Sequence, residues 1–184
     1  MEFHGSELGV TDQSQTMKAI AEEHGGGDFQ WSTRAEERNK LWAARHNAYY
    51  AAKALFPGQL GLATDICGPI SKLATAIQDT QRDLEENGVT AAIIGHVGDG
   101  NYHALMFSDP AKPEQLKRNK ELAHRMVERG LALGGTCTGE HGIGMGKMKY
   151  MAAEHGTALS AMADIKRAFD PQNIMNPGKM IPMN

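Results

Sequence analysis

The chain has 184 residues, a length that suits one ordinary domain or two small subdomains that share a core. Hydrophobic residues make up 41% of it, enough for a packed interior, and the net charge of -3 argues against a nucleic-acid-binding protein, which would normally carry a basic face. No apolar run approaches the roughly 20 residues that span a bilayer, and no basic stretch followed by an apolar one marks the N-terminal residues as a secretory signal.

The first half of the chain alternates predicted extended segments with helices. We expect short strands at 2–5 and 29–32, with a helix over 9–23 between them that three consecutive glycines end. The capping-box spacing of Thr33 and Glu36 predicts a long helix that continues to about Leu55. Since a domain rarely begins on half a strand, the segment 2–5 favours the interpretation that the chain is a fragment.

The second half predicts a hairpin enclosed by helices. Ser71 is the expected N-cap of a third helix. The expected elements from there on are a helix, a strand–turn–strand, a helix, a glycine-rich loop, and one or two helices interrupted by a glycine: 71–84, 89–107, 113–133, 136–146 and 147–169. Because helices separate strands but one hairpin is tight, the order predicts an α+β fold, with a mixed or antiparallel sheet and helices packed on one face.

The two cysteines, Cys67 and Cys137, lie far apart in the sequence and form no CxxC motif. A single pair does not define a disulfide framework, so we expect two free thiols in a reducing compartment. Together with the lack of a recognisable secretory signal, this predicts a cytoplasmic protein.

Two histidines flank the predicted hairpin turn. The dipeptide Asp99-Gly100 between alternating segments is a strong signal for a two-residue turn. Such a turn would place His96 directly opposite His103, with Cβ atoms roughly 4.5–5.5 Å apart on one face. Two imidazoles at that distance can bind one metal ion. The alternative is that both histidines merely line a hairpin, although the three glycines of this segment favour a close approach to another group.

A third candidate ligand lies in the glycine-rich loop, where Glu140 and His141 stand side by side between glycines. Two histidines and one carboxylate would leave positions on the ion open for a substrate. His141 would then remain unligated as a proton acceptor near neutral pH. The alternative is a flexible loop with exposed charges. The segment lacks the spacing of a Walker A loop, and the chain contains no HExxH motif, so neither a phosphate loop nor a zincin protease is indicated.

Two further positions are ambiguous by themselves. Arg45, on the predicted long helix, can pair bidentately with a carboxylate, although an isolated helical arginine is more often solvated. The segment 173–179, which contains Asn176, is a turn by composition, and nothing physical in it demands a function.

Taken together, these segments resemble the C-terminal domain of FAD-linked oxidases, a group that includes D-lactate, D-2-hydroxyglutarate and glycolate enzymes. The motifs that carry the resemblance are GHxGDGNxH, GEHGxG and NPGK, at 95–103, 139–144 and 176–179. The resemblance covers essentially the whole chain. It implies that residues 1–184 are a substrate- and metal-binding domain with ferredoxin-like subdomains, truncated at its N-terminus and lacking the FAD-binding domain that holds most of the flavin.

The resemblance also implies roles for individual residues. His96, His103 and Glu140 would be ligands of a divalent metal, zinc or manganese, and His141 the general base. Arg45 would grip the substrate carboxylate. The position of Asn176 matches a tail residue that lies near the flavin.

The expected reaction is oxidation of D-lactate, or a similar short 2-hydroxy acid, to the 2-keto acid with hydride transfer to FAD. Relatives specific for 2-hydroxyglutarate carry an asparagine at the position of Leu105 and a lysine where Ala63 aligns, so their absence disfavours a diacid. The implied partners are the FAD-binding domain and an electron acceptor such as cytochrome c or a quinone. A peripheral location at a respiratory membrane is the alternative to the cytoplasm.

Without the flavin domain, we expect the 184 residues to be inactive and prone to self-association through the exposed docking face. Two other classes of protein remain open from the residues alone. One is a metal-dependent hydrolase that uses the same His/His/Glu site with a bound water. The other is a non-catalytic ferredoxin-like binding module, in which the histidines would be structural.

Overall fold

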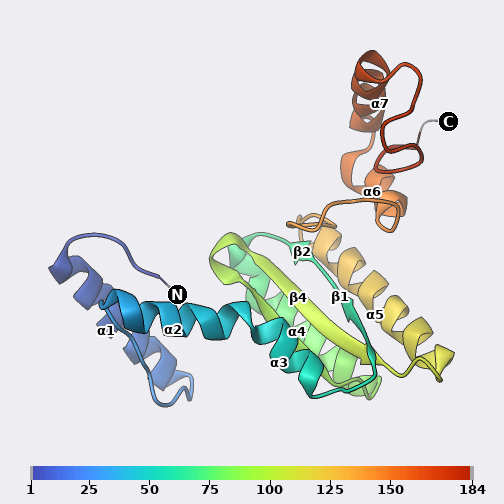
Figure 1. Cartoon of the computed structure of the whole chain (residues 1–184). Coiled ribbons are helices and arrows are strands. Elements are labelled where there is room, and N and C mark those ends of the chain that lie inside the picture. Colours follow the sequence, from blue (N-terminus) through green and yellow to red (C-terminus); the bar gives the residue numbers. More distant parts are fainter. Residues whose placement is uncertain (1, 183–184) are drawn as a thin grey trace. The chain divides into compact units, whose positions relative to one another are not determined.

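The structure, a computed structural model, describes residues 2–182, and the chain divides into two compact units between Ala48 and Tyr49 (Figure 1). The first unit contains α1 (Glu7–Glu23) and α2 (Ala35–His46). Helix α1 begins two residues earlier than predicted because Ser6 caps it, with Oγ accepting a hydrogen bond from the Gly9 backbone N–H.

The two strands predicted in the first unit are wrong, since residues 2–5 and 29–32 form no strand. An extended segment needs a partner for its backbone groups, and every strand pair in the described part of the chain involves the second unit. Thr33 also fails to cap α2. The backbone N–H of Arg34 bonds to Ser32 Oγ instead. The long helix that we predicted is divided at Asn47, after which α3 (Ala48–Ala54) begins.

The second unit is built on an antiparallel sheet with β4 (Asn101–Ser108) at its centre. One edge of β4 pairs with β3 (Ala91–His96), and the other edge pairs first with β1 (Leu60–Ala63) and then with β2 (Ile66–Cys67). Strands β1 and β2 keep the same register against β4, so they are one extended segment with an interruption at residues 64–65.

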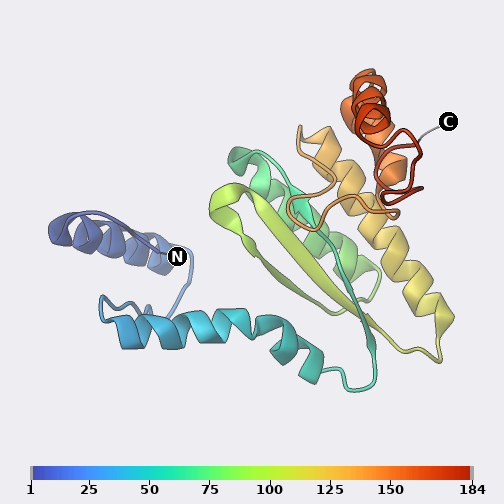
Figure 2. The same cartoon turned by 45° about the horizontal axis from the view of Figure 1, so that its top comes forward.

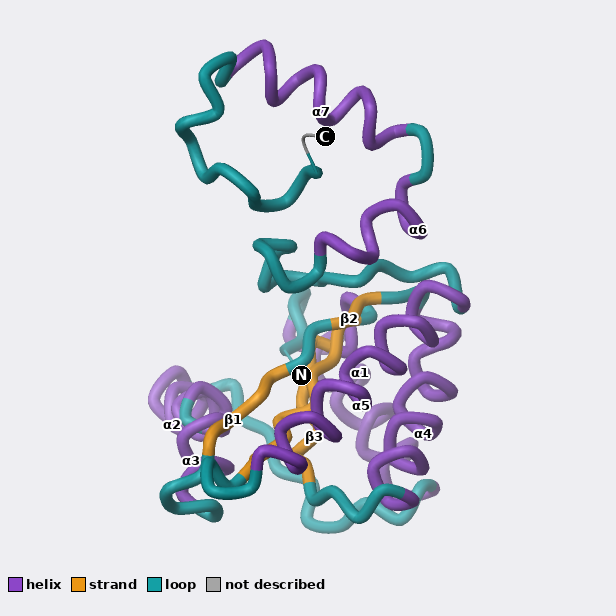
Figure 3. Tube along the Cα trace, turned by 90° about the vertical axis from the view of Figure 1, so that its right-hand side faces the viewer, coloured by secondary structure: helices purple, strands orange, loops and turns teal. Residues whose placement is uncertain are grey.

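Two long helices, α4 (Ile70–Glu86) and α5 (Pro113–Ala132), pack together on one face of this sheet (Figures 2 and 3). Alternate residues of β4 point beneath them into the core, namely Tyr102, Ala104 and Met106. The helices are also joined by Asp83 of α4, which pairs with two arginines of α5, Arg125 and Arg129. The predicted α+β fold with an antiparallel sheet is confirmed, and its two long helices lie on one face of the sheet.

The order of elements matches a ferredoxin-like arrangement. A strand segment, α4, the β3–β4 hairpin and α5 follow in turn, and an isolated bridge joins Thr136 to Cys67 where a fourth strand would lie. The opposite face of the sheet is covered at one end by Ala52 of α3 and by Phe56, whose ring stacks on Phe107 at a centroid distance of 4.6 Å. The other end of that face carries the chemistry described below.

The C-terminal part contains α6 (Met151–His155) and α7 (Ala158–Phe169), separated at Gly156 as predicted. Asp170 organises the tail, because its carboxylate accepts hydrogen bonds from the backbone N–H groups of Ile174 and Met175. Both cysteines are free thiols, as expected. None of the helices within residues 2–182 is both long and apolar enough to cross a bilayer.

The predicted two-residue hairpin turn is wrong. Residues 97–99 form a single 3-10 turn and Gly100 takes a left-handed conformation with φ 76°, so four residues connect the strands. His96 therefore pairs with Asn101, and His103 pairs with Ile94, a shift of two residues from the predicted register. Because side chains alternate with a period of two, this shift leaves both histidines on the same face.

Gly100 provides a test of this turn. We expect Gly100→Ala to lower the free energy of unfolding by about 2 kcal/mol or more, because an L-residue is strained at this φ and its Cβ would lie 2.0 Å from the Gly68 carbonyl oxygen. Gly98→Ala is the matched control, since a Cβ there meets nothing within 4 Å. Urea denaturation would measure both variants, and equal losses would contradict the turn geometry.

Candidate functional site

His103 lies in the middle of the sheet, on the face opposite α4 and α5. Its neighbours Tyr102 and Ala104 point into the core, so His103 faces the other way, where it is 6% exposed. Its Nδ1 lies 2.9 Å from the carbonyl oxygen of Thr64. Because a carbonyl only accepts hydrogen bonds, Nδ1 is the donor in this contact, and Nε2 lies on the other side of the ring.

That nitrogen faces a carboxylate. His103 Nε2 lies 2.9 Å from Glu140 Oε1, and His96 Nε2 lies 3.7 Å from Glu140 Oε2. At 2.9 Å, a proton or a metal cation must lie between the His103 nitrogen and the Glu140 oxygen. The ligand atoms of all three residues lie within 4.8 Å of one another. The structure therefore brings the three predicted ligands together.

This donor set fits a divalent metal. Two imidazoles and one carboxylate suit zinc or manganese, and three protein ligands leave room for a substrate atom. The hydrogen bond from His103 Nδ1 to a backbone carbonyl is the outer contact that metal-bound histidines usually make, and it points Nε2 at the site.

His141 lies beside this cluster. Its ring stacks on that of His103, with centroids 4.9 Å apart and planes 9° from parallel, and its Nε2 lies 3.7 Å from Glu140 Oε1. The side chain is 46% exposed, so it can meet a molecule that enters from solvent. This position is compatible with the predicted proton acceptor, which stays a prediction.

A residue that the sequence analysis did not single out for a role, Asp65, organises the loop that carries Glu140 and His141. Asp65 lies in the interruption between β1 and β2, and its side chain is fully buried. Its carboxylate accepts hydrogen bonds from the three consecutive backbone N–H groups of residues 139–141 at 2.8–3.1 Å. Side-chain donors complete the set: Thr138 at 2.6 Å, Asn101 at 2.8 Å and Lys147 at 3.3 Å.

The charge state of Asp65 follows from these contacts. Burial by itself would raise the pKa of this carboxyl, but hydrogen bonds and one positive charge outweigh it and hold the pKa far below its ordinary value. The groups that lower the pKa are Thr138, the His141 backbone N–H, Asn101 and Lys147. Asp65 is therefore a permanent buried anion at neutral pH.

Asp65, His103 and His141 form a second group of possible ligands. We do not assign a metal to it. Both carboxylate oxygens of Asp65 already accept hydrogen bonds, and the His103 nitrogen on that side, 3.8 Å from Asp65, donates to the Thr64 carbonyl. No lone pair remains there for a metal ion.

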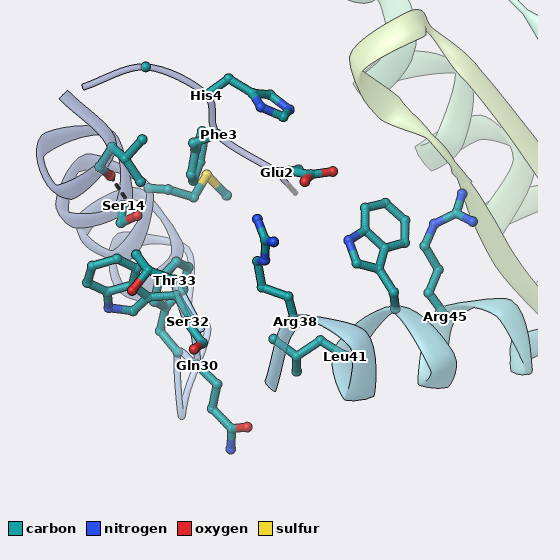
Figure 4. Close-up of a pocket in the computed structure, with 16 residues that line it drawn as sticks. Glu2, Phe3, His4, Ser14, Gln30, Ser32, Thr33, Arg38, Leu41 and Arg45 are labelled. Atoms are coloured by element: carbon teal, nitrogen blue, oxygen red, sulfur yellow. Dashed lines mark hydrogen bonds between the residues drawn. The ribbon is translucent and has the colours of Figure 1, made fainter. Parts of the chain in front are cut away.

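Arg45 belongs to the first unit, on α2, with its guanidinium 5.7 Å from the centre of the Trp42 ring. Together with Arg38, two helical turns earlier, it lines a cavity of about 620 Å³ in that unit (Figure 4). The cluster of His96, His103 and Glu140 lies in the second unit. The substrate role of Arg45 stays a prediction.

Asn176 lies in the tail after α7, outside the cluster. It takes a left-handed conformation with φ 49°, which asparagine tolerates, and its Oδ1 accepts a hydrogen bond from Lys179 Nζ at 3.3 Å. The tail is joined to the glycine-rich loop by a hydrogen bond from the Met180 backbone N–H to the Gly144 carbonyl oxygen. The predicted contact between Asn176 and the flavin is likewise still a prediction.

Together, the fold and the cluster define an α+β domain with a solvent-accessible His/His/Glu site. Residues 1–180 match the model of the family of FAD linked oxidases, C-terminal domain, and the chain belongs to this family. Curated relatives include a probable mitochondrial D-lactate dehydrogenase of Danio rerio, 45% identical, and a mitochondrial D-lactate dehydrogenase (cytochrome) of Arabidopsis thaliana, 42% identical. Glycolate oxidase subunit GlcD of Escherichia coli K12 is 31% identical.

These matches cover 98% of the chain but only 37%, 32% and 36% of the respective relatives. The chain thus spans about a third of their length. A solved structure of 4-ethylphenol oxidase from Gulosibacter chungangensis aligns with a TM-score of 0.61 at 20% identity, covering 97% of this chain and 38% of that one. At this identity the likeness supports the fold alone, and it agrees with the α+β architecture.

The lowered pKa of Asp65 predicts a loss of stability in acid. The carboxyl of an unfolded aspartate titrates near about 3.9, and the folded value is lower. The stabilisation is therefore complete above the unfolded value and disappears as the pH falls through about 4 toward the folded pKa. We expect Asp65→Asn to be about 3 kcal/mol or more less stable than the parent at pH 7, with a difference that shrinks below about pH 4. Urea unfolding at a series of pH values measures it, and a constant difference would contradict the assignment.

Proposed function

We propose that this chain is the substrate- and metal-binding domain of an FAD-dependent dehydrogenase that oxidises D-lactate, or a similar short 2-hydroxy acid, to the 2-keto acid. The observation that carries the proposal is the approach of His103 Nε2 to the Glu140 carboxylate, with His96 beside them, in a chain that belongs to the FAD-linked oxidase family. Family membership favours this function over the hydrolase and the non-catalytic alternatives.

His96, His103 and Glu140 hold the divalent ion in this proposal, with zinc and manganese as the candidates. A divalent ion held by these residues would supply Lewis-acid chemistry, which would lower the pKa of the hydroxyl of a 2-hydroxy acid. His141 accepts the hydroxyl proton at Nε2, which lies 3.7 Å from Glu140 Oε1 on a side chain that is 46% exposed. The Thr64 carbonyl keeps His103 in the tautomer that ligation requires.

Arg45 binds the substrate carboxylate and so fixes the orientation of C2. FAD, held mostly by another domain, supplies the acceptor for the hydride from C2, and Asn176 is the residue of this chain that we assign to the flavin. The electron acceptor in this proposal would be one such as cytochrome c or a quinone. Leu105 and Ala63, which are apolar where 2-hydroxyglutarate enzymes would place polar groups, favour a short monocarboxylate.

The names of the relatives also bear on location. The Danio rerio and Arabidopsis thaliana proteins are named as mitochondrial, as is D-lactate dehydrogenase (cytochrome) 1 of Saccharomyces cerevisiae. We therefore propose a location at or near mitochondria in place of the cytoplasmic one expected from composition. Association with a respiratory membrane through the electron acceptor is part of this proposal.

Metal content tests the site directly. We expect the parent, purified without chelators, to hold about one equivalent of zinc or manganese per chain. His103→Ala and Glu140→Gln should reduce it to background, because each removes one of three ligands. His24→Ala, at an exposed position at the end of α1, should retain the parent content. Elemental mass spectrometry measures all four proteins, and equal metal in the parent and both ligand variants would refute the site.

Turnover in the full-length protein tests the reaction. We expect reduction of a dye acceptor by D-lactate and little by D-2-hydroxyglutarate, and Arg45→Ala should raise the KM for D-lactate by about tenfold or more, because a charge-assisted bidentate contact is lost. Arg38→Ala, on the same face of α2 and lining the same cavity, is the matched control and should keep the parent KM. Residues 1–184 alone should show no turnover.

An equal rise in KM for both arginine variants would mean that the general positive charge of the cavity matters, and not a specific contact of Arg45. Preferred oxidation of D-2-hydroxyglutarate would refute the proposed substrate class.

A further inference from the structure

We infer that Asp65 is a positioning residue for the metal site: its buried carboxylate sets the conformation of residues 138–141 and thereby places Glu140 and His141 against the two histidines of the sheet. The inference rests on the proposed function for the role of Glu140 as a ligand. It concerns a residue that touches neither the substrate nor the ion.

The first support is the pattern of donors. The backbone N–H groups of residues 139, 140 and 141 all point at one carboxylate oxygen, Oδ2 of Asp65. Consecutive N–H groups that converge in this way form an anion-binding concavity, and here the anion is supplied by the chain itself. Thr138 closes the same turn, since its hydroxyl donates to Asp65 Oδ2 and also lies 3.3 Å from the Gly142 carbonyl oxygen.

The second support is the position of Asp65 relative to His103. The register that β1 and β2 share against β4 pairs Leu62 with Met106 and Ile66 with Tyr102, which places Asp65 directly opposite His103. Opposed residues share a face. The carboxylate that holds the loop is therefore attached to the strand beside the one that carries a metal ligand, so the loop and the sheet ligand are set by one local structure.

The third support is the close packing of the loop at Gly139 against Asn101 and Asp65. Asn101 donates to Asp65 Oδ1 at 2.8 Å and to the Ile66 carbonyl oxygen at 3.1 Å, and it is 5% exposed. A Cβ built on Gly139 would lie 2.1 Å from Asn101 Nδ2 and 3.0 Å from Asp65 Oδ1. The loop can approach Asp65 this closely only with glycine at position 139.

Lys147 anchors the other end of the loop to the same residue. Its Nζ donates to the backbone carbonyl oxygen of Asp65 at 3.0 Å and to Oδ2 at 3.3 Å, and its side chain is 20% exposed. Residues 142–146, which lie between the two attachments, include two glycines with positive φ, Gly142 and Gly144. Both ends of this segment are therefore fixed at Asp65.

Hydrogen exchange in the metal-free, intact protein tests whether Asp65 holds residues 138–141, without reference to activity. We expect Asp65→Asn to accelerate exchange of the amide protons of residues 139–141 by about tenfold or more, because their common acceptor loses its charge and half of its accepting capacity. The matched control is Asp83→Asn, which removes the charge of a partly buried carboxylate, paired with Arg125 and Arg129, and should leave exchange at 139–141 at the parent rate. Unchanged exchange in Asp65→Asn would overturn the inference.

Metal affinity tests whether the contacts of Asp65 also position Glu140 as a ligand. We expect Asp65→Asn to weaken binding of Co²⁺, used as a spectroscopic probe, by about 10–100-fold, the range typical for loss of an outer contact. The visible absorption of the bound Co²⁺ should also change. Asp83→Asn should keep the affinity and spectrum of the parent. Faster exchange with unchanged Co²⁺ affinity and spectrum would mean that Asp65 orders the loop without positioning the ligand, and would overturn the inference.

Gly139→Ala keeps the inference testable if Asp65→Asn does not fold. It retains the carboxylate but obstructs the approach of the loop to Asp65 and Asn101, so it should show the same faster exchange and weaker Co²⁺ binding. Gly146→Ala, where a Cβ meets nothing within 4 Å, is its control. If the parent binds no Co²⁺ while exchange at 139–141 still depends on Asp65, the metal role in the proposed function fails and the placement of Glu140 as a ligand fails with it.

Discussion

The buried carboxylate of Asp65 is the constraint on which the site depends. An ionised group without access to water is very unfavourable unless its hydrogen-bonding capacity is filled. Here five backbone and side-chain donors of the segment 138–147 meet that requirement, with Asn101 of β4 as a sixth. A glycine-rich segment, which would otherwise have many conformations, therefore has one that is strongly preferred.

The interruption between β1 and β2 also sets the orientation of His103, through Thr64. In a regular antiparallel pair, Thr64 and Ala104 would exchange two backbone hydrogen bonds. Only one is made here, from the Thr64 N–H to the Ala104 carbonyl oxygen, while the Ala104 N–H bonds to Thr64 Oγ1. The Thr64 carbonyl oxygen is thereby released to accept from His103 Nδ1. The threonine hydroxyl thus accepts the hydrogen bond of the Ala104 N–H, while the threonine carbonyl keeps the proton of the His103 ring on Nδ1.

Much of this arrangement could be predicted from the sequence, and the errors have physical causes. The helix–strand order of the second unit and the grouping of His96 with His103 followed from periodicity and turn residues. The hairpin register was wrong by two residues, yet the faces were right, because only an odd shift exchanges them. The strands expected at 2–5 and 29–32 failed because an extended pattern says nothing about whether a partner strand exists. The role of Asp65 was not predicted, because the local sequence pattern does not distinguish a buried aspartate from an exposed one.

The residues of the site that lie on the sheet and those that lie on the loop are held in place by different interactions. His96 and His103 are placed by a strand ladder, so any sequence that keeps the register will keep them together. Glu140 and His141 follow no ladder, and their placement depends on one acceptor, three consecutive N–H groups and a glycine that no other residue can replace without a clash. A substitution in the loop can therefore leave the fold intact and still separate the carboxylate from the imidazoles. This makes Asp65 and Gly139, which contact neither an ion nor a substrate in the proposed function, as important to it as the ligands themselves.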